Sequence, residues 1–378
     1  MIIDVSRLVG RLIKGRLPTG VDRVDIEYVR HFSYCSDALV RYRGQWLFLS
    51  HNDSLKLFDV LIKHDRSRLW MIRRMVAWYY FFSTVAPSAG RRLLNISHSG
   101  LDQEEYREKL QQYGFKPIFF VHDLIPITHP EYSRQGEDSR HQYRMETVLC
   151  YGEGVIVNSR DTLINLEAYA KDYSFPMIKS VVAHLASAPF PSLKTQSPMD
   201  KPYFVILGTI EPRKNHWVIL HIWREIAKKM GKDTPLLMII GQRGWECENV
   251  VDMLERCENI RPYVIEKSTC SDQELTAYVT HAQALLFPSF VEGYGMPLVE
   301  ALSMGTAVIA SNLSVFQEIA GDIPEYLDPL DGKGWMEMII EYTQPQSVKH
   351  FEQSMRMKDF VPPSWKDHFK SIEAFLAN

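Results

Sequence analysis

The sequence predicts an α/β protein made of two doubly wound domains. Short apolar runs rich in β-branched and aromatic residues alternate with longer helical patterns, as in parallel sheets whose strands are joined by crossover helices. A chain of 378 residues is too long for one ordinary core and suits two domains. Residues 187–202 are crowded with proline, serine and charge, as in a linker, and they divide the chain near its middle.

The buried strands are expected where apolar runs end in polar or glycine residues. In the first half these runs are residues 117–123 and 154–159, and in the second half they are 203–208, 235–241, 284–289 and 306–311. Open parallel sheets bind ligands at the carboxyl ends of their strands. The loops that follow these runs are therefore where we expect the chemistry, in a cleft between the two domains.

Composition narrows the class of function. Hydrophobic residues make up 46% and charged residues 24%, so the chain is globular and not disordered. A net charge of −3 argues against a dedicated nucleic-acid-binding protein. The five cysteines are scattered, which favours reduced thiols over a zinc site. The first residues contain no apolar segment of signal-peptide length, and we expect a cytoplasmic protein.

Residues 69–87 are the most membrane-like segment. Arg73 and Arg74 interrupt it, so a spanning helix is not expected. Two interpretations remain open, an ordinary core helix with two exposed arginines and an interfacial helix that lies on an anionic membrane surface.

The stretch SFVEGYGMPLVEALSMG, residues 289–305, carries two carboxylates in unusual places. Glu292 lies in a glycine-rich loop, and Glu300 lies one turn inside an apolar helix that Pro297 begins and Gly305 ends. A helix start favours an anion such as a phosphate. Two acceptor carboxylates beside such a helix start suit a sugar nucleotide.

This stretch closely resembles the E-x7-E signature of retaining glycosyltransferases of family four, which have the GT-B fold. The resemblance implies that Glu292 contacts the donor sugar near the reacting carbon and that Glu300 contacts the nucleotide ribose. It also assigns Tyr294, Gly295 and Met296 to the donor site.

A second motif, GTIEPRKNH at residues 208–216, resembles the phosphate-binding loop of the same family. Lys214 matches the family's lysine, and its cation would stabilise a leaving diphosphate. The family often has an arginine where Thr209 stands here. The resemblance therefore leaves Arg213 or Arg243 as the second cation.

A third motif, FFVHDLIPITHPEY at residues 119–132, is similar to the H-D-L-I-P segment of family members that build bacterial polysaccharides, many of them mannosyltransferases. The resemblance implies that His122 binds a donor-sugar hydroxyl or orients the acceptor. Asp123 could pair with His122 or act as the acceptor-side base. His98 and His129 are weaker candidates.

Two further segments extend the resemblance over most of the chain. Gly20 opens an amphipathic helix that resembles the family's loop beneath the diphosphate, although Asp22 stands where the family often has a second glycine. Residues 362–376 resemble the terminal helix that crosses back to the first domain. We therefore expect domains at 1–190 with 362–378 and at 191–361.

The expected function is a retaining hexosyltransferase, and mannose from GDP-mannose is the favoured donor. No D-x-D pair occurs in the sequence, which together with the basic loop favours catalysis without a metal. The expected acceptor is a lipid-linked, capsular or O-antigen glycan, and the enzyme would attach peripherally to the inner face of a membrane. The alternative is a non-catalytic glycan-binding or assembly subunit with the same fold. Because a loop carboxylate contributes little packing, Glu292→Ala is expected to leave the fold intact.

Overall fold

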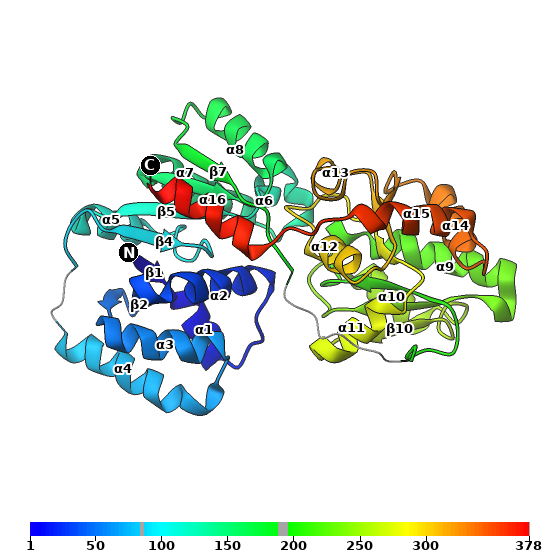
Figure 1. Cartoon of the computed structure of the whole chain (residues 1–378), viewed down its shortest axis with the longest axis horizontal. Coiled ribbons are helices and arrows are strands. Elements are labelled where there is room, and N and C mark those ends of the chain that lie inside the picture. Colours follow the sequence, from blue (N-terminus) through cyan, green and yellow to red (C-terminus); the bar gives the residue numbers. More distant parts are fainter. Residues whose placement is uncertain (84–86, 188–195, 378) are drawn as a thin grey trace. The chain divides into compact units, whose positions relative to one another are not determined.

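The computed structural model describes residues 1–83, 87–187 and 196–377, which pack as two compact units (Figure 1). Unit 1 comprises residues 1–128, 135–183 and 366–378, and unit 2 comprises residues 129–134 and 184–365. The expected domain boundary between residues 190 and 191 lies outside the described residues. The expected linker at 187–202 lies partly outside them.

Unit 1 is built on a seven-stranded sheet in the order β3-β2-β1-β4-β5-β6-β7. All neighbouring strands are parallel except β2 and β3, which form an antiparallel hairpin. The strands are β1 Ile2–Asp4, β2 Asp37–Tyr42, β3 Gln45–Phe48, β4 Arg92–Asn95, β5 Lys116–Val121, β6 Gly154–Val157 and β7 Lys179–Val182. The helices are α1 Ser6–Ile13, α2 Gly20–Phe32, α3 His51–Ile62, α4 Leu69–Phe82, α5 Glu104–Tyr113, α6 Ile125–Thr128, α7 Glu137–Tyr151, α8 Arg160–Asp172 and α16 Trp365–Ala377.

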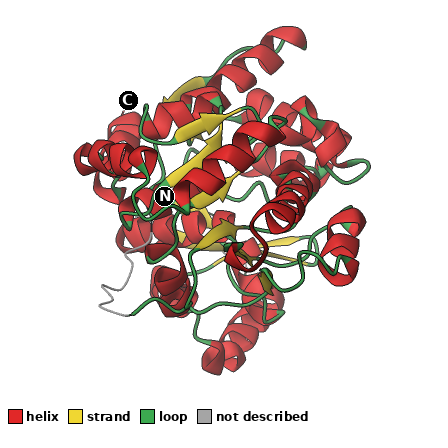
Figure 2. Cartoon of the chain, turned by 90° about the vertical axis from the view of Figure 1, so that its right-hand side faces the viewer, coloured by secondary structure: helices red, strands yellow, loops and turns green. Residues whose placement is uncertain are grey.

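Unit 2 is built on a six-stranded, fully parallel sheet in the order β10-β9-β8-β11-β12-β13. The strands are β8 Tyr203–Leu207, β9 Leu236–Ile240, β10 Val264–Lys267, β11 Leu285–Phe287, β12 Val308–Ser311 and β13 Glu325–Leu327. The helices are α9 His216–Met230, α10 Glu248–Arg256, α11 Asp272–Thr280, α12 Met296–Ser303, α13 Ser314–Ala320, α14 Gly332–Tyr342 and α15 Val348–Arg356. Helices cover both faces of each sheet (Figure 1, Figure 2).

Both sheets reverse their winding at one point. Strand order runs backward in sequence on one side of β1 or β8 and forward on the other side. The switch point of unit 1 therefore lies between β1 and β4, and that of unit 2 lies between β8 and β11. In open α/β sheets the crevice outside the carboxyl ends of the strands at a switch point is the usual ligand site.

The two doubly wound domains predicted from the sequence are confirmed, as is the terminal helix α16, which belongs to unit 1. Each of the predicted buried strands is present, with ends that differ by at most two residues. Unit 2 has a core of aliphatic side chains around Trp223 and Trp335, whose indole N–H groups donate to the carbonyls of Pro235 (3.0 Å) and Asp328 (2.9 Å). This core fixes the strands of unit 2 and thereby the loops at their carboxyl ends.

Candidate active site

The candidate site in unit 2 is made by the loops that follow the central strands. Gly208 ends β8 with φ +129°, a backbone conformation that favours glycine. A Cβ built on Gly241, at the end of β9, would lie 1.9 Å from the carbonyl oxygen of Gly208. The two loops therefore touch through their backbones, and this contact requires glycine.

The loop after β8 places two cations beside a carboxylate from the loop after β11. Lys214 ends a short 3₁₀ turn, Pro212–Lys214, and is buried. Its Nζ donates to Oε1 of Glu292, which also accepts from Ser289 Oγ at 2.8 Å. Nη1 of Arg213 lies 2.7 Å from the other carboxylate oxygen of Glu292. We call Arg213, Lys214 and Glu292 the switch-point cluster.

The charges of the cluster are fixed by its surroundings. Burial alone would raise the pKa of Glu292, but the neighbouring cations of Arg213 and Lys214 outweigh it and hold that pKa at about 2. Burial lowers the pKa of Lys214, and the attraction of Glu292 opposes this shift. Glu292 is therefore an anion at neutral pH, and the cluster holds two cations and one anion, with the buried Glu211 as a second carboxylate beside Arg213.

The buried position of Glu292 corrects one expectation from the sequence. A loop carboxylate was expected to matter little for the fold. The side chain of Glu292 is instead 7% exposed and balances two cations. Removing it leaves Arg213 and Lys214 without their shared anion, and breaking a buried ion pair in this way is strongly destabilising.

In unit 1, His122 and Asp123 follow β5 directly, as predicted. His122 is buried, and its Nε2 lies 2.7 Å from the carbonyl oxygen of Ile96. A carbonyl can only accept, so Nε2 carries the ring proton. Burial lowers the pKa of His122 to about 4, so the imidazole is neutral at pH 7. Asp123 uses Oδ1 to accept from the backbone N–H of Ile125 at 3.1 Å.

The weaker histidine candidates have different positions. His98 is half-buried and packs against His122, with ring centroids 5.5 Å apart, and also against His141. His129 belongs to unit 2, where it stacks on Tyr132. The sequence had given no indication of His141, whose Nε2 donates to the carbonyl of Asp123 at 3.0 Å.

Gly20 begins α2 as predicted, and the structure explains why Asp22 follows it. The carboxylate of Asp22 accepts from the backbone N–H of Thr19 at 2.7 Å, which caps the helix start. It also pairs with Arg7 and Arg11, each at 2.7 Å. Asp22 therefore stabilises the turn that a second glycine would leave flexible.

Comparison with known proteins identifies the part of the chain that holds the switch-point cluster. Residues 192–323 match the family described as "Glycosyl transferases group 1". We call residues 192–323 the group 1 domain after this match. Lys214, Glu292 and Glu300 all lie inside it.

Two bacterial relatives extend the similarity beyond the group 1 domain. The serotype-specific mannosyltransferase WbdA of Escherichia coli is 25% identical over 257 residues, which cover 62% of this chain and 31% of WbdA. The chain thus spans about a third of the length of that relative. O-antigen chain mannosyltransferase B of E. coli is 26% identical over 267 residues, which cover 67% of this chain and 68% of the relative.

The fold is also that of a solved structure. Sucrose-phosphate synthase from Thermosynechococcus elongatus superimposes with a TM-score of 0.66 at 13% identity, covering 100% of this chain and 98% of that chain. The likeness shows the GT-B fold that the resemblance had implied.

Within the group 1 domain, α12 positions the remaining donor-site candidates. Gly295 precedes the helix with φ +111°, and a Cβ there would lie 2.7 Å from a ring carbon of Phe316. Met296 is the first helical residue and is half-buried. The hydroxyl of Tyr294 donates to the carbonyl of Leu185 at 2.7 Å, so this side chain anchors the loop.

Glu300 lies in α12 between fully buried neighbours, Val299 and Ala301, and is itself 9% exposed. A buried carboxylate on an apolar helix is rarely a purely solvated side chain. Its predicted role toward the ribose stays a prediction.

The two alternatives for the second cation differ in position. Arg213 belongs to the switch-point cluster, and its Nε also pairs with Glu211 at 2.6 Å. Arg243 is more exposed and pairs with Glu255 at 2.6 Å and Glu266 at 2.8 Å, neither of which is a member of the cluster. This geometry favours Arg213.

Thr209 directly follows Gly208 at the start of the loop after β8. A Cβ built on Gly244 would lie 2.8 Å from its Cγ2, so the loop after β9 packs on Thr209. A long arginine side chain at position 209 would compete with this contact.

Sequence reasoning missed the residues that hold the cluster together. Ser289 donates to Glu292, Glu211 pairs with Arg213, and the backbone N–H of Phe290 donates to the carbonyl of Arg213 at 2.8 Å. Ser289 carried a signal, because it ends a predicted strand three residues before Glu292. Glu211 carried no such signal in the sequence, because its pairing with Arg213 depends on the conformation of the turn between them.

Two searches of the described residues complete the description of the site. No group of three or more His, Cys, Asp or Glu side chains among them has the geometry to hold a metal ion. No helix among residues 1–83, 87–187 and 196–377 has the length and apolar character needed to cross a bilayer.

Proposed function

We propose that this chain is a retaining mannosyltransferase that moves mannose from GDP-mannose to a glycan acceptor without a metal ion. The relatives named above are described as mannosyltransferases, one of them acting in O-antigen chains. Their names support mannose over other hexoses, and the group 1 domain supports transfer from a nucleotide sugar.

The switch-point cluster is the single observation that carries the proposal. Charge grows on the diphosphate as the glycosidic bond breaks, and preorganised cations stabilise that charge in the transition state. Lys214 and Arg213 supply two such cations at the loop where a phosphate is expected. Their pairing with Glu292 keeps both side chains oriented before the donor arrives.

Glu292 has a second role in this proposal. Its carboxylate stays ionised because its pKa is about 2, so it can accept hydrogen bonds from sugar hydroxyls at neutral pH. Glu300, which lies on α12, would accept hydrogen bonds from the ribose hydroxyls of the nucleotide. No side-chain nucleophile is needed, because the leaving phosphate itself takes the acceptor proton on the face from which it departs.

His122 and Asp123 would serve the acceptor side. His122 is neutral and donates from Nε2 to a backbone carbonyl, so its other ring nitrogen is an acceptor. An acceptor nitrogen suits a sugar hydroxyl, which can donate its proton to it.

We also propose that the acceptor glycan is lipid-linked and that α4 holds the chain at an anionic membrane surface. One face of α4 is fastened to unit 1 by Ile72, Val76 and Tyr79, which are buried. The opposite face exposes Trp70 (59%), Trp78 (54%), Phe81 (72%) and Phe82 (72%), with Arg73 and Arg74 also exposed. Aromatic and basic side chains together are typical of helices that lie in a membrane interface.

Donor turnover tests the proposed activity. The purified chain is incubated with GDP-mannose, UDP-glucose, ADP-glucose and dTDP-glucose in EDTA, and free or transferred sugar is followed by NMR. We expect GDP-mannose to be consumed fastest and the product to keep the anomeric configuration of the donor. Consumption of none of these donors, with or without added magnesium, would favour the non-catalytic subunit.

A further inference from the structure

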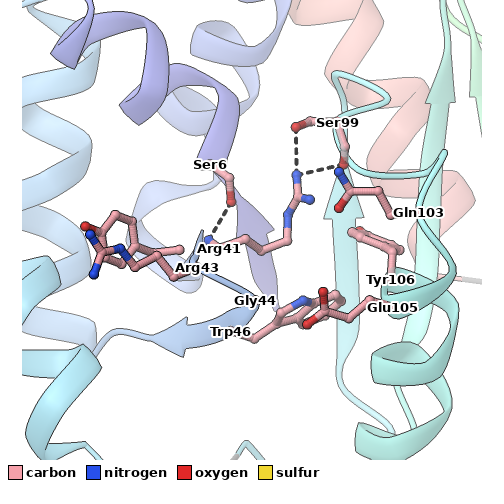
Figure 3. Close-up of a pocket in the computed structure, with 10 residues that line it drawn as sticks. Ser6, Arg41, Arg43, Gly44, Trp46, Ser99, Gln103, Glu105 and Tyr106 are labelled. Atoms are coloured by element: carbon pink, nitrogen blue, oxygen red, sulfur yellow. Dashed lines mark hydrogen bonds between the residues drawn. The ribbon is translucent and has the colours of Figure 1, made fainter.

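A cavity of about 310 Å³ lies in unit 1, well separated in sequence from the switch-point cluster (Figure 3). Ser6 follows β1, Arg41 lies near the end of β2 and Ser99 follows β4. These are the carboxyl ends of the strands on both sides of the unit 1 switch point, where open α/β sheets bind ligands. The volume is at the lower limit for small-molecule sites and suits a single compact group.

Arg41 is held rigidly at the centre of this cavity. Its Nε lies 2.8 Å from Asp4, and one terminal nitrogen, Nη2, donates to the carbonyl and hydroxyl of Ser99 at 2.8 and 2.7 Å. The guanidinium lies over the ring of Tyr106 at 5.2 Å. Figure 3 shows the side chain reaching from β2 toward Ser99. The bonds of Nε and Nη2 hold the guanidinium in place, and the N–H groups of Nη1 are left to donate to a ligand.

The loop after β4 leaves space for the guanidinium of Arg41. Gly100 has φ +81°, and a Cβ built on it would lie 1.8 Å from Nη1 of Arg41. Only glycine fits here, both for its backbone conformation and for the space that the guanidinium takes. The loop after β4 is therefore shaped around Arg41.

The rim of the cavity adds groups that bond with hydroxyls. Gln103 and Glu105 are exposed at the start of α5, and the carboxylate of Glu105 faces the β2–β3 turn, 3.1 Å from a Cβ built on Gly44. Trp46 contributes an aromatic surface to the lining. Amide, carboxylate, guanidinium and aromatic groups are the set that recognises a polyhydroxylated ring.

The balance of charge decides between a neutral and an anionic ligand. Asp4 neutralises Arg41, and Glu105 offsets the remaining cation of the lining, Arg43. A phosphate would meet the carboxylate of Glu105 without an excess of positive charge to hold it. A saccharide needs acceptors as well as donors, and this lining supplies both.

The cavity is joined to the candidate acceptor-side residue by one loop. Ile96 accepts from His122, and three residues later Ser99 accepts from Arg41. Asn95 also stabilises this loop, because its side-chain amide donates to the carbonyl of Ser99 at 3.1 Å. A ring bound beside Arg41 thus sits next to the loop that orients His122.

We propose that this cavity binds one sugar ring of the acceptor glycan, and that Arg41, Gln103 and Glu105 select that ring. The proposal rests on the proposed function, since it names how the acceptor of that reaction is recognised. A neutral saccharide is the committed ligand.

Saccharide binding to the full chain tests the proposal directly. Methyl α-mannoside and an α-linked mannobiose are added, and binding is measured by saturation-transfer NMR for the wild type, Glu105→Ala and Gln103→Ala. Each substitution should weaken binding about tenfold, the loss expected for one hydrogen bond to a charged or amide group. Glu108→Ala, an exposed change on the same helix, is the matched control and should bind as the wild type does.

Equal binding by Glu105→Ala and Glu108→Ala, or no saccharide binding by the wild type, would overturn the proposal. So would displacement of the saccharide by an equal concentration of inorganic phosphate, which would make the cavity an anion site. The hydrolysis of GDP-mannose, measured on the same samples, separates the two proposals. Glu105→Ala should leave this rate unchanged and raise the KM of a mannobiose acceptor about tenfold. Absence of donor hydrolysis in the wild type would count against the proposed function alone.

Discussion

At the scale of single residues, the sequence predicted the members of the switch-point cluster but not their pairing. Lys214 and Glu292 were recognised from two separate motifs, each by its local pattern. The bond between them joins residues 78 positions apart, so it depends on where β8 and β11 place their loops. Burial and charge balance at a site are properties of that arrangement, which explains why the structural weight of Glu292 was missed.

Substitution of Glu292 should separate its structural role from its chemical role. Glu292→Ala leaves the buried Lys214 without its carboxylate partner and leaves Arg213 paired with Glu211, and we expect the free energy of unfolding to fall by about 3–5 kcal/mol. Glu292→Gln keeps a hydrogen-bond acceptor and should lose less. Urea unfolding of both variants measures this difference. Glu337→Ala, which removes an exposed partner of Lys333, should change stability by less than about 1 kcal/mol. A Glu292→Ala protein as stable as the wild type would contradict the account of the cluster.

At the scale of elements, prediction succeeded where the end signals are local. Pro297 lies in the first turn of α12, and Gly305 follows its end with φ +77°, as the sequence had indicated. Residues 69–82 carry apolar side chains on every side of the helix except at Arg73 and Arg74, so the pattern could not distinguish a core helix from an interfacial helix. The packing of α4 against unit 1 decides which side is left exposed.

The exposed face of α4 should bind anionic bilayers reversibly. Each basic side chain near such a surface contributes about 1 kcal/mol, and salt screens this attraction within roughly 10 Å. We expect the chain to float with phosphatidylglycerol vesicles at low salt and to be released at high salt. The Arg73→Gln, Arg74→Gln double variant should float poorly, whereas Arg256→Gln, an exposed change on α10, should float as the wild type does. Absence of flotation at low salt would contradict the proposed attachment of α4 to an anionic membrane surface.

At the scale of the whole molecule, the domain class was predictable but the order of strands was not. The predicted strands lie in apolar runs, whereas β1 and β13 contain three residues each, one of them charged, and carry no periodicity to detect. The cavity around Arg41 was missed for this reason. Ser6, Arg41, Ser99 and Glu105 meet only because β1, β2 and β4 are neighbours.

Stability should fall in mild acid because several histidines are buried without charge. Burial lowers the pKa of His122 to about 4 and that of His216 to about 3, and also lowers the pKa values of His98 and His141. The unfolded chain, with a histidine pKa of about 6.5, binds more protons below that pH. Stability is therefore complete above about pH 6.5 and is lost as the pH falls. Glu292 acts in a lower window, since its stabilisation persists until the pH falls below about 4.5.

Urea unfolding at about pH 7 and about pH 5 measures this loss. We expect His122 and His216 each to contribute about 2 kcal/mol of it. Both ring nitrogens of His216 are buried without a hydrogen-bond partner, so His216→Leu should remove its share of the pH dependence. The same change of stability with pH in His216→Leu and the wild type would show that this imidazole does not titrate on unfolding.

The turnover of GDP-mannose by Lys214→Gln tests the central claim most directly, because that substitution removes one cation and keeps a polar hydrogen-bonding side chain. The assay is run in EDTA beside the wild type and Arg256→Gln. If the switch-point cluster stabilises the leaving diphosphate, Lys214→Gln should be slower by about 100-fold or more, while Arg256→Gln keeps the wild-type rate. A folded Lys214→Gln protein that consumes GDP-mannose at the wild-type rate would contradict the assignment of this cluster as the site of transfer.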